Sequence, residues 1–182
     1  MTLKAKQRRR QRRRAVAYVA VSAGWAASVW LGTVLAPPEW LHAVALFVHL
    51  ASLIVGLGAV LVVEWYALLW ATEWRSVRDL RQVDSTVKLL VWAGLIGLLA
   101  SGALLQPDLQ APTTIVKLVA VLVVSLNGVA LTQWTDYLKR FPRKMRFRAL
   151  PRWIRIRFVS SAVLSQLAWW TAVVIGMINS TS

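Results

Sequence analysis

The chain has 182 residues, of which 58% are hydrophobic and only 16% are charged, and its formal net charge is +15. A soluble domain carries about 25% charged residues, so this composition argues against a soluble protein and indicates a membrane protein. The absence of cysteine excludes disulfide bonds, thiolate metal sites and a cysteine nucleophile.

Five apolar segments are long enough to cross a bilayer. A hydrocarbon core about 30 Å thick needs about 20 helical residues. We predict an all-α integral membrane bundle of five transmembrane helices (residues 15–182) after a basic cytoplasmic tail at residues 1–14. The predicted spans are residues 15–36, 40–65, 88–105, 114–134 and 158–178. The second span could continue to about residue 74, with Trp65, Tyr66, Trp70 and Trp74 near the inner interface.

The first span could be a signal peptide, because it follows a basic stretch and ends in small residues. Its apolar stretch is too long for that reading, and cleavage after Ala36 would place Pro37 directly after the cut. We therefore expect an uncleaved membrane anchor.

Basic residues are segregated to one side of the predicted bundle. All of the 22 Lys and Arg residues except Lys117 lie before the first span, between the second and third, or between the fourth and fifth. Because cytoplasmic loops are enriched in Lys and Arg, the N-terminus should be cytoplasmic and the C-terminus outside. We expect a multi-pass protein of the bacterial cytoplasmic (plasma) membrane.

The basic blocks themselves resemble nucleic-acid-binding segments, but topology and attraction to anionic lipid explain them better. The segment "RFPRKMRFRALPRWIRIRF" mixes arginine with apolar residues and suits the headgroup region, although Pro142 and Pro151 interrupt it. The arginines expected at lipid headgroups are Arg8, Arg9, Arg10, Arg12, Arg13, Arg14, Arg143, Arg148 and Arg155.

The only two histidines, His42 and His49, lie seven residues apart in the second span. Seven residues correspond to about two helical turns, so both histidines share a face with Gly56. Small residues at this face permit close helix approach, and polar residues can hydrogen-bond across it. Both histidines should therefore face the bundle interior, with His49 the better buried.

The polar residues near the outer ends of the spans could form one outward vestibule. Ionisable groups inside a membrane are costly and are therefore candidates for function. The alternative is that Lys117 extends to the headgroups and the histidines only pack. Glu64 is expected at the inner interface. The candidate vestibule residues are Glu39, His42, His49, Asp108, Lys117 and Asn127.

Three stretches, "HLASLIVGLGAVLVVEW", "KLVAVLVVSLNGVAL" and "LSQLAWWTAVVIG", resemble a group of small uncharacterised bacterial multi-pass membrane proteins. The first is more remotely similar to copper-resistance-D-type and cytochrome b561-type helical bundles. The resemblance implies a haem- or copper-associated membrane protein, with His42 and His49 as metal ligands. Both histidines lie on one helix, so one monomer cannot supply a bis-histidine haem site. A His/Met pair with Met177, a single axial histidine or a site shared in a dimer stays open.

Three classes of function are compatible with these patterns. Small-residue stripes favour a non-enzymatic accessory or assembly subunit, associated with other membrane subunits or with a second copy. The alternatives are a haem or copper redox protein and a small carrier or ion pathway. No nucleotide-binding or hydrolase motif is present, and the short loops do not favour an enzyme.

Overall fold

The computed structural model describes residues 3–138, 141–142 and 145–181. In this part of the chain five α-helices follow one another, and a short 3-10 turn, η1 (Phe147–Ala149), precedes the last. Each helix is long and apolar enough to cross a membrane, which confirms the all-α prediction. The helices are α1 (Leu3–Val34), α2 (Glu39–Ala71), α3 (Val77–Gly102), α4 (Pro112–Leu138) and α5 (Arg152–Thr181).

The helices extend beyond the predicted spans because hydropathy detects only their apolar parts. α1 continues through the basic block. α3 begins at Val77, where the Ser76 side chain accepts a hydrogen bond from the Asp79 amide and the Asp79 carboxylate accepts one from the Ser76 amide. α5 begins directly after Pro151, so Arg155 lies in its first turns rather than in a separate segment.

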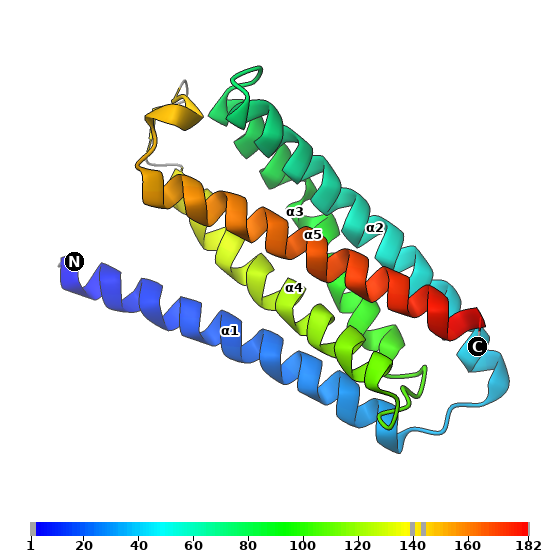
Figure 1. Cartoon of the computed structure of the whole chain (residues 1–182). Coiled ribbons are helices and arrows are strands. Elements are labelled where there is room, and N and C mark those ends of the chain that lie inside the picture. Colours follow the sequence, from blue (N-terminus) through cyan, green and yellow to red (C-terminus); the bar gives the residue numbers. More distant parts are fainter. Residues whose placement is uncertain (1–2, 139–140, 143–144, 182) are drawn as a thin grey trace.

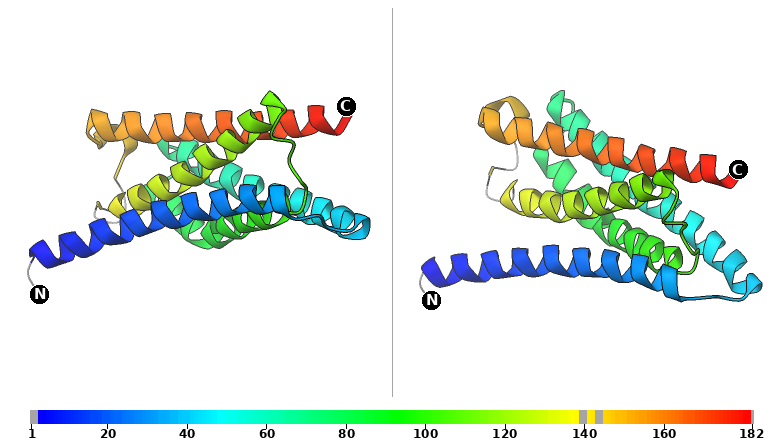
Figure 2. Two further views of the ribbon diagram at one scale, coloured as in Figure 1. Left: turned by 90° about the horizontal axis from the view of Figure 1, so that it is seen from below. Right: turned by 60° about the horizontal axis from the view of Figure 1, so that its bottom comes forward.

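The helices run alternately up and down (Figure 1). α2 packs along α3, α4 packs along α5, and α1 lies beside α3 and α4 at the edge of the bundle (Figure 2). We call the end that holds the start of α1, the α2–α3 turn and the α4–α5 connection the basic end, since the arginine blocks lie there. The other end holds the α1–α2 and α3–α4 connections and is called the opposite end.

Glycine residues bring α2 and α3 together. A Cβ atom added at Gly94 would lie 2.5 Å from the Gly56 Cα atom and 2.8 Å from the Ser52 carbonyl oxygen. A Cβ atom added at Gly97 would collide with the Ser52 side chain. The small-residue stripes predicted on these two spans therefore pack against each other.

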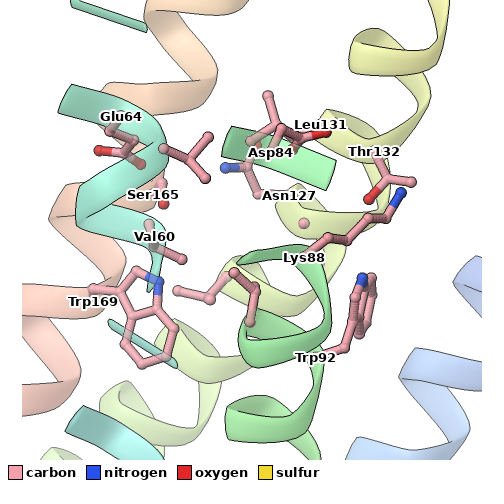
Figure 3. Close-up of a pocket in the computed structure, with 14 residues that line it drawn as sticks. Val60, Glu64, Asp84, Lys88, Trp92, Asn127, Leu131, Thr132, Ser165 and Trp169 are labelled. Atoms are coloured by element: carbon pink, nitrogen blue, oxygen red, sulfur yellow. The ribbon is translucent and has the colours of Figure 1, made fainter. Parts of the chain in front are cut away.

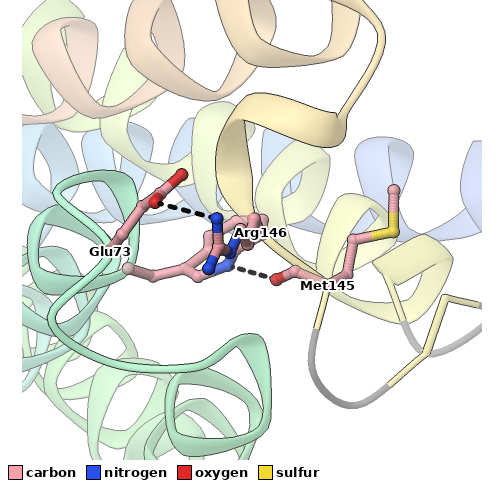
Figure 4. A network of polar contacts seen from close by, with 4 residues as sticks. Glu73, Met145 and Arg146 are labelled. Carbon is pink, nitrogen blue, oxygen red and sulfur yellow. Dashed lines mark hydrogen bonds and ion pairs between the residues drawn. The ribbon is translucent and has the colours of Figure 1, made fainter.

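The buried core is concentrated at the basic end. Trp70 is only 2% exposed, its ring meets Phe147 edge to face, and its indole nitrogen donates to the Met145 carbonyl at 2.9 Å. Glu73 pairs with Arg146 at 3.9 Å beside this contact (Figure 4). Trp70 is thus a core residue, whereas Trp74, which was expected to lie with it at the interface, is 82% exposed.

Candidate functional site

The two histidines differ in their surroundings. His49 is half-buried, and its Nδ1 atom lies 3.0 Å from the Ser101 hydroxyl oxygen of α3. That hydroxyl donates to the Gly97 carbonyl at 2.5 Å, so Nδ1 is the donor in its bond with Ser101. His42 is exposed, because it lies about 10 Å further along α2, beyond the point where α3 has ended.

Lys117 also lies near the opposite end. Its side chain is half-buried on α4 and lies within electrostatic range of His49. Glu39 and Asp108 are exposed, and the Asp108 carboxylate accepts a hydrogen bond from the Gln110 amide of its own loop. Of the predicted vestibule residues, His49 and Lys117 are half-buried and within electrostatic range of each other, whereas the two acids lie at the surface.

Asn127 has a different environment from the other predicted vestibule residues. Its amide nitrogen donates to the Ser161 carbonyl at 2.9 Å, and its amide oxygen accepts from the Ser161 hydroxyl at 2.7 Å. Asn127 therefore joins α4 to α5, as polar side chains do between membrane helices.

The Glu64 side chain points into the bundle, although we predicted from the sequence that it would lie at the inner membrane interface. Gln166 of α5 donates to one Glu64 carboxylate oxygen, Oε2, at 2.6 Å, and Trp170 donates to the Gln166 side-chain oxygen at 3.0 Å. The second carboxylate oxygen, Oε1, is buried and has no hydrogen-bond partner. Gln166 thus orients the carboxylate while half of its hydrogen-bonding capacity stays unused.

Glu64 lines a cavity of about 70 Å³ between α2, α3, α4 and α5 (Figure 3). Asp84 and Lys88 come from α3, one helical turn apart, and Asn127 comes from α4. The remaining lining residues are Val60, Val63, Val91, Trp92, Val124, Gly128, Leu131, Thr132, Ser165 and Trp169. The cavity therefore combines an apolar wall with both charge signs.

The cavity contains a second unsatisfied polar atom. Trp169 is 3% exposed, and its indole nitrogen is buried without a hydrogen-bond partner. An unpartnered donor and an unpartnered carboxylate oxygen in one cavity are unusual, since buried polar groups are nearly always satisfied. A volume of this size holds a few water molecules or a small ion beside these residues.

The sequence patterns did not identify Glu64, Asp84, Lys88 and Trp169 as site residues. One signal was present, because Asp84 and Lys88 have opposite charges at a spacing of four. Gln166 could not be assigned as the partner of Glu64 from the sequence, since the two residues are 102 positions apart and only helix packing joins them.

The arginines predicted at lipid headgroups lie at the basic end wherever the structure describes them. Arg148 is exposed in η1, and Arg155 is half-buried in the first turns of α5. Arg143 and the side chain of Arg10 lie outside the described part of the structure. The exposed arginines of α1 are Arg8, Arg9, Arg12, Arg13 and Arg14.

The described residues contain no group of three or more His, Asp and Glu side chains that could hold a metal ion. Met177, the candidate partner of a haem-ligating histidine, is mostly exposed on α5. His49 already uses Nδ1 in its bond with Ser101, which leaves Nε2 as its only nitrogen for a ligand.

Comparison of the chain with protein-family models, with curated proteins and with solved structures finds no match. The similarity to copper-resistance-D-type and cytochrome b561-type bundles is therefore a hypothesis that depends on sequence patterns alone.

Proposed function

We propose that this multi-pass membrane protein binds and releases a proton at Glu64 inside its bundle, and so acts as a small carrier or ion pathway. The observation that carries the proposal is the Glu64 carboxylate: Oε2 accepts a hydrogen bond from Gln166, Oε1 is buried without a partner, and the residue lines a cavity together with Asp84 and Lys88. A protonatable group in contact with a cavity large enough for water can exchange protons with it.

The energetic cost of this arrangement supports a functional reading. Ionisable side chains inside membrane spans are costly, so such residues are retained where they act on ions or substrates. Glu64 stands in the apolar run "GLGAVLVVEW", where an aliphatic residue would pack at no such cost. The placement of a carboxylate there is therefore difficult to explain by packing.

Two groups of ionisable side chains are separated along the direction of α2. Glu64 lies near the basic end, and His49 with Lys117 lies near the opposite end. Glu64 lies fifteen positions after His49, which corresponds to about 22 Å of helix. The α2–α3 seam between them contains Ser52 and close-packed glycines. Transfer across the membrane would use Glu64 on one side and His49 on the other.

An accessory-subunit function, favoured by the small-residue stripes, has less support. The stripes of α2 and α3 are used within the chain, since Gly56 contacts Gly94 and Ser52 contacts Gly97. These two stripes therefore do not indicate a surface for a second protein. The basic end is taken as cytoplasmic, from the charge asymmetry alone.

The test is proton flux in proteoliposomes that contain a trapped pH-sensitive dye, driven by a potassium-diffusion potential. We expect dye acidification above that of protein-free vesicles. Glu64→Gln keeps the shape and the bond with Gln166 but cannot titrate, so it should lower the flux at least tenfold. Glu39→Gln is the matched control, because Glu39 is exposed at the end of α2. Equal flux for the wild-type protein and Glu64→Gln, or no flux above empty vesicles, would disprove the proposal.

A further inference from the structure

An apolar groove separates α2 from α5 at the basic end. Its volume is about 400 Å³, and its walls are the last turns of α2 and the early turns of α5. Leu61 and Leu68 line it from α2, Val159 and Val163 from α5, and Phe147 from η1. These walls suit a hydrocarbon chain, since they offer methyl groups and aromatic rings.

The groove has the depth of one membrane leaflet. On α5 the lining residues Ala162 and Gln166 share a face with Arg155, which lies seven and eleven residues before them. Eleven helical residues span about 16 Å, close to half of a hydrocarbon core about 30 Å thick. An acyl chain from the leaflet at the basic end would extend from Arg155 toward Gln166.

Positive charge lies at the mouth of this groove. The Arg155 Nε atom is buried and has no hydrogen-bond partner. Arg148 follows directly after Phe147 of the groove wall, and Arg152 lies one turn before Arg155; both are exposed. An arginine with an unused donor beside two further arginines fits a phosphate group.

We propose that this groove binds one acyl chain of an anionic glycerophospholipid whose phosphate is held by Arg155 and Arg148. The apolar wall recognises the chain, and the arginines select the headgroup charge. The inner end of this groove is lined by Glu64 and Gln166, so the lipid site adjoins the proton site. Its test measures lipid binding directly and therefore does not depend on proton flux.

The experiment is titration of delipidated, detergent-purified protein with phosphatidylglycerol, monitored by native mass spectrometry. Dioleoyl phosphatidylglycerol should bind with a stoichiometry of one per chain and more tightly than dioleoyl phosphatidylcholine. Diheptanoyl phosphatidylglycerol, which has the same headgroup but short chains, should bind more weakly than the dioleoyl lipid. The proposal would be overturned if phosphatidylglycerol and phosphatidylcholine bound equally tightly. It would also be overturned if the dioleoyl and diheptanoyl forms of phosphatidylglycerol bound equally tightly.

Variants then locate the site. Arg155→Gln should weaken phosphatidylglycerol binding about fivefold, as expected for the loss of one basic side chain at an anionic surface. Arg157→Gln is its control, since Arg157 lies over the rings of Trp134 and Trp153. An equal loss in both variants would indicate diffuse attraction and contradict a defined site.

A second pair of variants tests the groove wall. Val163→Trp should fill the groove and lower occupancy by the dioleoyl lipid, whereas Leu164→Trp should not. The two residues are adjacent and similarly exposed, at 52% and 46%, but only Val163 lines the groove. Unchanged lipid binding by a folded Val163→Trp protein would show that the chain lies elsewhere.

Discussion

Asn127 of α4 and Ser161 of α5 exchange two hydrogen bonds, of 2.9 and 2.7 Å, across the seam between their helices. One bond uses the Ser161 backbone carbonyl and the other its side chain. Without a hydrophobic force between helices in lipid, such reciprocal bonds and close packing hold the two helices together.

Replacing Asn127 should therefore weaken the α4–α5 pair. We expect Asn127→Ala to lower the free energy of unfolding by about 1–2 kcal/mol, the range for interhelical polar contacts in membranes. Denaturation in mixed micelles would measure the change. Ser160→Ala is the control, because Ser160 is exposed and bonds only within α5. A loss of stability no larger than that of Ser160→Ala would show that the pair contributes little.

The glycine contact between α2 and α3 leads to a second prediction. Gly94→Ala places a methyl group 2.5 Å from the Gly56 Cα atom, so the two backbones must separate. We expect a loss of about 1–3 kcal/mol, the usual cost of overpacking. The same denaturation assay measures it.

Gly58→Ala is the matched control for Gly94→Ala. A Cβ atom at Gly58 has no neighbour within 4 Å, so alanine there should leave stability unchanged or raise it, since glycine is a poor helix former. If both variants were equally stable, the α2–α3 seam would have to be looser than the structure describes.

His49 and His42 should respond differently to substitution. His49→Gln keeps a donor for Ser101 and should cost at most about 1–2 kcal/mol, while His49→Leu should cost more because it removes that donor. His42→Leu should have little effect, since His42 is exposed. Thermal denaturation of the three purified variants provides the comparison. Equal effects of the two leucine variants would contradict the packing assigned to His49.

Membrane orientation can be tested with single cysteines, because the natural chain has none. Cysteine at Gln110, an exposed residue between α3 and α4, should react with an impermeant thiol reagent in intact spheroplasts. Cysteine at Trp74, exposed at the basic end, should react only after the membrane is opened. The reverse pattern would place the basic end outside and overturn the positive-inside assignment.

Proton binding at Glu64 should depend on its neighbour Gln166. Gln166→Leu removes the donor to Oε2 of Glu64 and should lower the proton flux, because the carboxylate loses the hydrogen bond that orients it. Gln133→Leu is the matched control, because Gln133 does not line the Glu64 cavity. The measurement is flux against pH in proteoliposomes. Flux unchanged in Gln166→Leu would exclude Gln166 as a positioning residue.

The sequence by itself determined the all-α class and the five apolar helices. These properties are local, because a membrane span needs about 20 apolar residues in a row, whatever its neighbours are. Helical spacing also predicted the packed face of α2, since Gly56 is buried on it. The prediction that His42 faces the bundle interior was wrong. Helical spacing gives the direction of a side chain around its own helix, but it does not reveal where the neighbouring helix ends.

The tertiary structure decided which helices pair and which polar residues meet. Spacing along α2 places Glu64 relative to His49, but only the packing of α2, α3, α4 and α5 encloses Glu64 with Lys88 and Asn127. The bond between Glu64 and Gln166 joins two helices that are distant in sequence, and no periodic pattern within either helix specifies it. The physical reason is that helix periodicity defines a direction around one axis, whereas a site requires the relative position of several axes.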